Sequence, residues 1–93
     1  MKITFDPNKR IKTQEERGLD FLDAALVLEG AVFEYEDLRE DYGETRTIAV
    51  GHLDRRMVIV GYVLRSETYH IFSMRKANER EIKKYQKQFE ESG

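Results

Sequence analysis

The chain has 93 residues, 37% of them charged, no Cys, two His and a formal net charge of −2. This length suits one domain over residues 1–93, and with no Cys and with His52 far from His70 we expect no disulfide, metal or cofactor. No segment approaches the ~20 apolar residues of a membrane span, so we expect a cytoplasmic protein with no membrane partner. The negative net charge argues against a uniformly basic nucleic-acid binder.

A short strand and a surface helix are predicted at the start of the chain. The strand covers Ile3–Phe5. The helix covers Pro7–Arg17, because Asp6 is a good N-cap, Pro suits the first helical position and Gly18 can end a helix. Its only large aliphatic side chain is Ile11, so we expect this helix on the surface.

A second helix is predicted over Phe21–Leu28. Asp20 is placed to cap it, Asp23 complements the positive end of the helix dipole, and Gly30 ends it. The segment is apolar on nearly all sides, so we expect it to be the core helix.

Four strands in a row are predicted next, which is typical of an antiparallel meander. They cover Ala31–Tyr35, Thr45–His52, Met57–Leu64 and Thr68–Met74. Gly61 indicates a bulge in the third strand. The acidic segment Glu34–Glu44 holds six acids and one base. We interpret it as a solvated connection, or as a surface that repels RNA or contacts a basic partner.

A C-terminal helix is predicted after Asn78, because Asn is a good N-cap and Glu81 follows three residues on, as in a capping box. One face of this helix is apolar and carries Ile82, Tyr85 and Phe89. The opposite face is a cationic stripe of Arg80, Lys83, Lys84 and Lys87. We expect the tail, residues 90–93, to fray. The whole chain predicts an α+β fold: a short N-terminal strand, two helices, a four-stranded antiparallel meander and a C-terminal helix against the sheet.

Four sequence motifs are spread along nearly the whole chain. They are Ile3-Thr-Phe-Asp-Pro-Asn-Lys, Gly18-Leu-Asp-Phe-Leu-Asp-Ala-Ala, Gly43-Glu-Thr-Arg-Thr-Ile-Ala-Val-Gly51, and Ile71-Phe-Ser-Met-Arg-Lys-Ala-Asn with Glu81 and Tyr85 beyond it. In this order and spacing they resemble the motifs of the BrnT family of bacterial type II toxins. The resemblance implies a fold similar to that of the RelE-type ribonucleases.

The resemblance also implies a function. It implies a toxin that cleaves mRNA without a metal, inhibits translation, and is held inactive by a BrnA-like antitoxin of the ribbon-helix-helix type. Operator DNA would then be bound only through the antitoxin complex. The chain departs from the family at one place, because Glu16-Arg17-Gly18 stands where the family usually has Lys-His-Gly. A guanidinium stays protonated, so Arg17 cannot replace a histidine base.

Catalysis of this kind needs cations that neutralise charge on the phosphoryl oxygens, and Arg75 at a strand end is the first candidate. The alternative is an ion pair with Glu67 or the acidic segment. Lys76 helps if the chain breaks toward the helix, and otherwise points to the other face. Arg80 is a candidate in the first helical turn, if its face borders the site. Glu81 is either a general base or the partner in the capping box.

Further basic residues are candidate RNA contacts: Lys9, Lys12, Arg17 and Arg46. Solvated positions on the first helix explain the first three equally well, and a cross-strand ion pair explains Arg46. We expect His70 on the strand face opposite Arg75, as a strand residue more than a base, and Tyr85 in the core with its hydroxyl at the edge.

Two other functions remain open from the sequence. The acidic balance and the missing Lys-His pair favour a non-catalytic interaction module that binds an antitoxin-like partner and tunes transcriptional repression. A standalone nucleic-acid binder is the third possibility, and steep salt dependence of binding without cleavage would indicate it.

Overall fold

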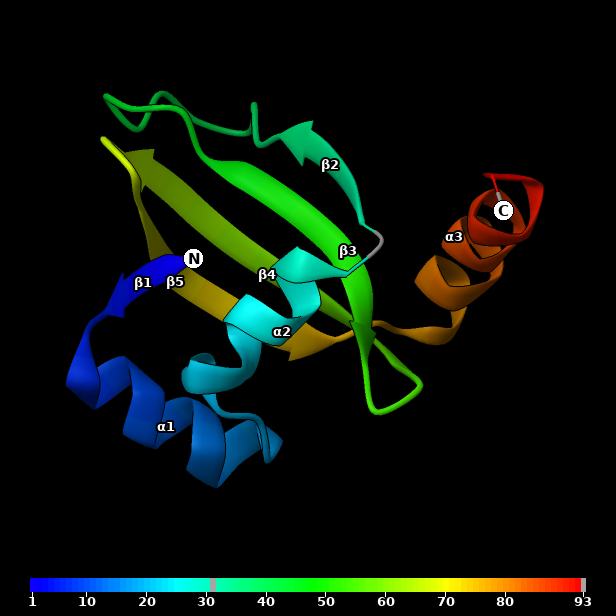
Figure 1. Cartoon of the computed structure of the whole chain (residues 1–93), viewed down its shortest axis with the longest axis horizontal. Coiled ribbons are helices and arrows are strands. Elements are labelled where there is room, and N and C mark those ends of the chain that lie inside the picture. Colours follow the sequence, from blue (N-terminus) through cyan, green and yellow to red (C-terminus); the bar gives the residue numbers. More distant parts are fainter. Residues whose placement is uncertain (31, 93) are drawn as a thin grey trace.

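A computed structural model describes residues 1–30 and 32–92, which form a five-stranded sheet with helices beside it (Figure 1). In chain order the elements are β1 (Lys2–Phe5), α1 (Pro7–Arg17), the 3₁₀ turn η1 (Phe21–Asp23), α2 (Ala24–Glu29), β2 (Phe33–Glu36), β3 (Thr47–Leu53), β4 (Arg56–Arg65), β5 (Thr68–Lys76) and α3 (Glu79–Ser92). The predicted α+β class is confirmed.

The sheet has the strand order β1-β5-β4-β3-β2. Neighbours from β2 to β5 are antiparallel, as the predicted meander requires. The expectation of a four-stranded sheet is wrong, because β1 pairs in parallel with β5 and adds a fifth strand. Parallel strands need a long crossover, and here α1, α2 and the whole meander separate the two partners along the chain. Nothing local in the sequence marks such a pair.

Most strand ends differ from the predicted ones by one or two residues, and three other differences concern the ends of elements. The second helix begins as the 3₁₀ turn Phe21–Asp23, a common way to start an α-helix, and Asp20 caps it by accepting the Leu22 N–H at 3.0 Å. β2 starts at Phe33; the predicted start at Ala31 lies outside the described residues. The tail does not fray as expected, since α3 continues through Ser92; Gly93 lies outside the described residues.

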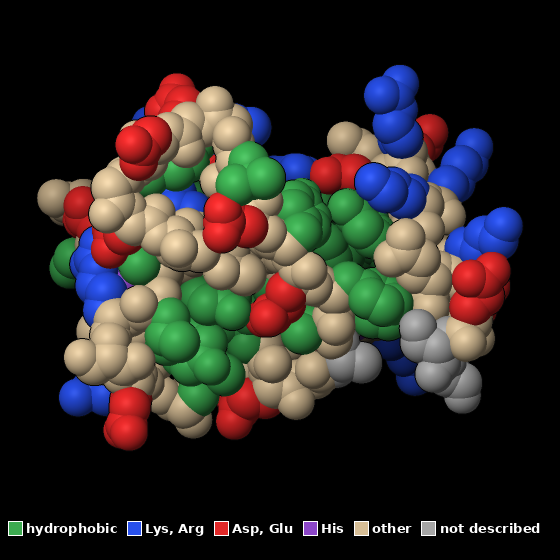
Figure 2. All heavy atoms as spheres, turned by 90° about the horizontal axis from the view of Figure 1, so that it is seen from above, with side chains coloured by type: hydrophobic (Ala, Val, Ile, Leu, Met, Phe, Trp, Pro, Cys, Tyr) green, Lys and Arg blue, Asp and Glu red, His purple; other side chains and the backbone are tan. Residues whose placement is uncertain are grey.

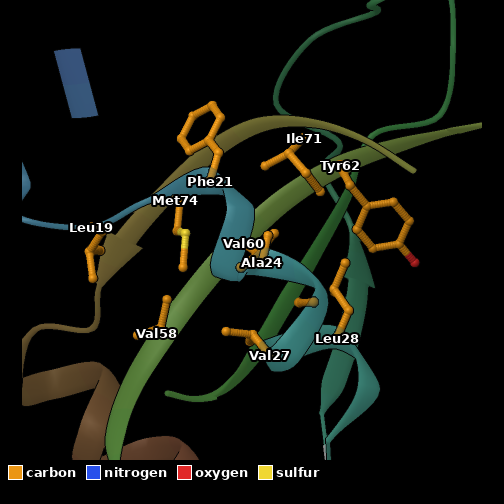
Figure 3. Close-up of a cluster of buried hydrophobic side chains, with 11 residues drawn as sticks. Leu19, Phe21, Ala24, Val27, Leu28, Val58, Val60, Tyr62, Ile71 and Met74 are labelled. Atoms are coloured by element: carbon orange, nitrogen blue, oxygen red, sulfur yellow. The ribbon is translucent and has the colours of Figure 1, made fainter. Parts of the chain in front are cut away.

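The first face of the sheet carries the larger core. Side chains from η1 and α2 pack there onto strands β3, β4 and β5 (Figure 3). The buried members are Leu19, Phe21, Ala24, Val27, Leu28, Ala49, Val58, Val60, Tyr62, Ile71 and Met74. The prediction of a core helix is therefore confirmed, although Leu26 on its outer side is exposed. Figure 1 shows α1 and α2 together on this side, and α1 is a surface helix as expected.

The sequence predicted a bulge at Gly61 in β4; the pairing is irregular at that position, but the extra residue lies in β5. Gly61 pairs with Ser73 and Tyr62 with Ile71, so Phe72 is the extra residue. Ile71 and Met74 consequently face the same core although three positions separate them. A regular strand would have placed His70 and Arg75 on opposite faces; the extra residue puts both on the second face, and that expectation is wrong.

The second face of the sheet is covered only in part, by α3. Tyr85 and Phe89 pack there against a smaller core of Ile48, Val50, Met57 and Ile59. The predicted capping box is confirmed: the Asn78 N–H donates to Glu81 Oε1, and the Glu81 N–H donates to Asn78 Oδ1, both at 2.9 Å. Figure 1 shows α3 beside the end of the sheet rather than across it. The rest of this face is therefore left for the site described next.

Candidate functional site

Arg75 and Glu81 form a bidentate ion pair where β5 passes into α3. Arg75 Nη1 donates to Glu81 Oε1 at 2.7 Å, and Nη2 donates to Oε2 at 2.8 Å. The Arg75 side chain is 42% exposed and that of Glu81 is 19% exposed. Arg75 holds the pKa of the Glu81 carboxyl at about 2, with the Asn78 N–H as a further contributor after the opposing effect of burial. Glu81 is therefore ionised, orients Arg75, and is a weak proton acceptor.

The guanidinium of Arg75 keeps one edge available. Glu81 occupies the end between Nη1 and Nη2, and the carbonyl of Lys76 lies 3.5 Å from Nη1. For the part of the chain that the structure describes, no partner is recorded for Nε. The Nε–Nη2 edge is a fork whose geometry matches two oxygens of a phosphate or carboxylate. Arg75 can thus bind an anion without releasing Glu81.

Two tyrosines border the ion pair. Tyr35 comes from β2, and its hydroxyl interacts with that of Tyr85 on α3. Burial raises the pKa of Tyr35 and the contact with Tyr85 adds to this, while Arg75 acts in the opposite direction. Tyr85 is buried in the small core with its hydroxyl at the core's edge, as expected. At neutral pH the Tyr35 phenol therefore stays protonated and can donate a hydrogen bond.

A hollow of about 420 Å³ lies in front of Arg75. Its floor is the second face of the sheet and its wall is the start of the acidic segment; the lining residues are Tyr35, Glu36, Asp37, Leu38, Arg39, Ile48, Ile59, Ser73 and Arg75. Arg39 in this wall is tied to Asp37 by bonds of 2.8 and 2.7 Å. That pair lowers the pKa of Asp37 to about 2. In this wall the charges of Asp37 and Arg39 are therefore paired with each other, and Glu36 and Leu38 lie beside them.

Lys76 and Arg80 do not lie beside Arg75. Because β5 continues regularly to Lys76, consecutive side chains point to opposite faces. Lys76 lines a different hollow, of about 560 Å³, together with Asp20, Asp23 and Arg56. Arg80 is exposed on α3 and does not line the hollow around Arg75. The structure thus separates these two candidates from Arg75 and Glu81.

The three candidate RNA contacts on α1 lie together. Lys9, Lys12 and Arg17 line a small hollow of about 210 Å³ at the edge of β5, next to Phe72 and Ser73. Ser73 also lines the hollow around Arg75, so the two hollows adjoin. Arg17 Nη1 donates to the Met74 carbonyl at 3.0 Å, which fixes α1 against the strand.

Among the described residues, Arg46 just before β3 has no cross-strand ion pair of the kind considered from the sequence. Its guanidinium lies 4.0 Å from the centroid of the Tyr42 ring and 4.4 Å from that of Phe72. Cation–π contacts hold it on both sides. Phe72 thus contacts Arg46 and also lines the hollow next to α1.

His70 lies apart from Arg75, although on the same face. It is five residues away along β5, roughly 15 Å. Its Nδ1 shares a hydrogen bond of 2.9 Å with Thr4 Oγ1. Burial lowers the pKa of His70, and Arg65 adds to this. His70 is therefore a strand residue away from the ion pair.

Sequence reasoning missed Tyr35 and Arg39 as neighbours of Arg75. The alternation of Phe33 and Tyr35 with acidic residues placed both aromatic rings on one face of a strand. It carried no information on which residue lies across the sheet. The pairing of β2 with β3 supplies that information.

Charges on the surface are segregated, as their order in the sequence suggested. Figure 2 shows acidic side chains around the acidic segment, Lys and Arg projecting from α3, and hydrophobic side chains between them. Tyr35 and Leu38 are among the exposed hydrophobic residues. Within residues 1–30 and 32–92, no three His, Cys, Asp or Glu side chains gather to hold a metal ion. None of the described helices is long and apolar enough to cross a membrane.

A family model described as the ribonuclease toxin BrnT of type II toxin–antitoxin systems matches residues 5–81. The matched range contains the Arg75–Glu81 pair, the three basic residues on α1 and Arg46. The search of curated proteins gave no match.

Proposed function

The chain belongs to the BrnT family of ribonuclease toxins of type II toxin–antitoxin systems, and from this premise we propose that it cleaves mRNA and thereby inhibits translation. The geometry around Arg75 is the observation that carries the proposal. The partly exposed Arg75 side chain lines a hollow that carries both polar and apolar side chains, and Glu81 holds its guanidinium through two hydrogen bonds. RNA is the substrate in this proposal, and no metal takes part in the reaction.

Cleavage proceeds by attack of a ribose 2′-oxygen, which gives its proton to solvent, on the adjacent phosphorus. The bond from phosphorus to the 5′-oxygen of the next nucleotide breaks, and that oxygen takes a proton from water, so the products are a 2′,3′-cyclic phosphate and a 5′-hydroxyl. Negative charge then increases on the phosphoryl oxygens, and a preorganised donor facing them lowers the barrier. The Nε–Nη2 edge of Arg75 supplies two parallel donors for these oxygens. Arg75 is thus the catalytic residue that we propose.

Glu81 and Tyr35 have supporting roles in this proposal. Glu81 is a positioning residue: its carboxylate already accepts from Arg75 and from the Asn78 N–H, and its low pKa makes it a weak base. The Tyr35 hydroxyl remains protonated and donates a hydrogen bond to the substrate phosphate. Lys76 and Arg80 take no part, because they lie away from the hollow.

The RNA backbone follows the edge of β5 toward α1. Lys9, Lys12 and Arg17 gather around a hollow that adjoins the one at Arg75 through Ser73. Lys and Arg bind successive phosphates without reading sequence. This surface is local, so it is compatible with the overall charge of −2.

A toxin of a type II system has an antitoxin partner. We propose that the antitoxin is BrnA-like, of the ribbon-helix-helix type, and that operator DNA is bound only through the toxin–antitoxin complex. The protein then acts in the cytoplasm, where its RNA substrate and its partner are found.

Inducible expression in a bacterial host tests the proposed function. Wild-type protein is expected to arrest growth and to cleave purified mRNA in the presence of EDTA. The Arg75→Ala variant is expected to lose both effects, with a fall in cleavage rate of roughly 10²–10³. Lys76→Ala is the matched control, because it removes the next cation along the chain on the other face. An Arg75→Ala protein that is folded and still cleaves like the wild type would remove Arg75 from the site.

One observation favours a second function, that of a non-catalytic module which binds an antitoxin-like partner and tunes repression. The guanidinium groups of Arg39, Arg65 and Arg75 are already paired with Asp37, Glu44 and Glu81. Such pairing weakens attraction for a polyanion. Soluble wild-type protein that accumulates without growth arrest or RNA cleavage would support this function over the enzyme.

A further inference from the structure

Arg46 is held by stacking rather than by a carboxylate. Its Cζ atom lies 4.0 Å from the ring centroid of Tyr42 on one side and 4.4 Å from that of Phe72 on the other. Its Nε atom is buried and, among the described residues, has no hydrogen-bond partner. Arg46 differs in this from Arg39 and Arg65, which both have carboxylate partners. Within residues 1–30 and 32–92, Arg46 is therefore held by its two ring contacts and not by an ion pair.

The two rings that hold Arg46 differ in how they are fixed. Phe72 belongs to β5, is the extra residue of the bulge, and packs against the smaller core. Tyr42 belongs to the irregular connection between β2 and β3. Its hydroxyl donates a long hydrogen bond of 3.4 Å to Asp37. Tyr42 is thus the ring that can leave, and Phe72 is the ring that stays.

We propose that Arg46 is a stacking site for an unpaired nucleobase of RNA. The base takes the place of Tyr42 on the outer side of the guanidinium, while Phe72 supports the inner side. Every base has a π-face, so stacking of this kind tolerates any sequence. The acidic segment occupies the site in free protein, with the Tyr42 ring in the position of a base. This inference rests on the proposed function, because it takes RNA as the ligand.

The position of Arg46 fits a strand of RNA that also reaches Arg75. Arg75 pairs across the sheet with Ile59, which pairs with Val50, and Arg46 lies four residues before Val50. The two arginines are therefore separated by about 13 Å along the strands. Both lie on the second face of the sheet. A span of this length leaves room for a few nucleotides between the stacked base and the reacting phosphate.

The neighbouring cations strengthen the proposal. Phe72 beneath Arg46 also lines the hollow with Lys9 and Lys12. Arg46 and Tyr42 themselves line a hollow that carries five acidic side chains, Glu36, Asp37, Glu40, Asp41 and Glu44. These carboxylates repel phosphate, so the phosphates of a base stacked on Arg46 are directed past Phe72 toward Lys9 and Lys12. Stacking aromatic groups and cations that follow a backbone are the two components of single-strand binding sites.

Binding of two uncleavable oligomers tests the stacking site. One is a 2′-O-methyl adenosine oligomer with a central 2-aminopurine, and the other is an abasic oligomer of the same length. Neither has a 2′-hydroxyl at the tested positions, so wild-type protein can be used. The wild type is expected to bind the adenosine oligomer more tightly than the abasic one and to quench the 2-aminopurine fluorescence.

Two substitutions separate stacking from charge. Arg46→Lys keeps the positive charge but loses the planar guanidinium group. It is expected to weaken binding of the adenosine oligomer roughly tenfold and to leave the affinity for the abasic oligomer unchanged. Tyr42→Leu uncovers the outer side of Arg46 and is expected to tighten binding of the adenosine oligomer only. Circular dichroism confirms that both variants are folded.

Three results would overturn the inference: equal binding of the two oligomers by the wild type, an equal effect of Arg46→Lys on both, or weaker binding by Tyr42→Leu. Cleavage of unmodified mRNA by the wild type is measured in parallel. Cleavage that persists while one of these results is obtained refutes the stacking site alone. Absence of cleavage refutes the proposed function, whatever the oligomers show.

Discussion

The ring of Phe72 occupies the space that a side chain on Gly61 would need. A Cβ atom built on Gly61 would lie 2.6 Å from Cζ of Phe72 and 2.5 Å from Oγ of Ser73. The side chains of Phe72 and Ser73 fill the space beside Gly61. This packing places Phe72 under Arg46 and sets the direction of Ser73 and Arg75. The absence of a side chain on one strand thus positions the candidate site on the next strand.

The Gly61→Ala substitution is expected to destabilise the protein by roughly 1–3 kcal/mol, because the added methyl group overpacks a fixed part of the sheet. Urea denaturation measures the free energy of unfolding. Gly30→Ala is a suitable control, since a Cβ there meets its nearest atoms at ordinary contact distances of 3.6 Å and more. A Gly61→Ala protein as stable as the wild type would show that the bulge can relax.

Glu81→Gln is expected to change how stability depends on acid. The folded-state pKa of Glu81 is lowered from 4.5 to about 2. Its ionised form therefore stabilises the fold above pH 4.5, and this contribution is lost as pH falls toward 2. We expect the variant to lose roughly 2–3 kcal/mol at neutral pH, allowing for the exposure of Arg75, and to show a flatter acid limb.

Thermal or urea unfolding at a series of pH values measures this difference. Glu79→Gln in the same helical turn is the control, with an expected effect of a few tenths of a kcal/mol. Parallel acid limbs for wild type and Glu81→Gln would contradict the assignment of the low pKa to the ion pair.

The rate of RNA cleavage is expected to rise steadily between about pH 5 and pH 9, without a plateau. The Glu81 carboxyl has a pKa of about 2, and the pKa of Tyr35 is raised above its ordinary value of 10.0. Neither group changes its charge in this range, so the pH dependence reflects ionisation of the ribose hydroxyl. Single-turnover rates across this range provide the measurement.

A plateau or a bell-shaped profile centred near neutrality would instead indicate a histidine base. His70 would then be tested by His70→Gln, and the proposed separation of this residue from the reaction would be given up if the plateau disappeared.

Lys12→Gln is expected to weaken RNA binding uniformly across sequences. Loss of one phosphate contact reduces the slope of log affinity against log salt by about 0.7 for a single strand. Lys83→Gln, on the cationic stripe of α3, is the control and is expected to leave the slope unchanged. Fluorescence anisotropy with an uncleavable oligomer at several salt concentrations measures both slopes. A reduced slope for Lys83→Gln together with an unchanged slope for Lys12→Gln would instead indicate that RNA binds along α3.

Local features of the sequence were predicted well wherever a local contact decides them. The N-cap at Asp6 accepts the Asn8 N–H at 2.8 Å, and Gly18 ends α1 in a left-handed conformation with φ 66°. The capping box of Asn78 and Glu81 is also as predicted, and the predicted irregularity occurs at Gly61, although its extra residue lies in β5. Each depends on residues within a few positions of one another or on a strong backbone preference.

The sequence alone determined the α+β class, the meander, the caps and the family, because these depend on short-range periodicity, backbone preferences and ordered motifs. Only the tertiary structure decided that β1 joins β5, that Arg75 faces Tyr35 while Lys76 faces the other way, and that Arg46 lies between two rings. These relations depend on strand register and on one extra residue in β5. A shift of one position exchanges the two faces of a strand, and residues far apart in the chain set that register.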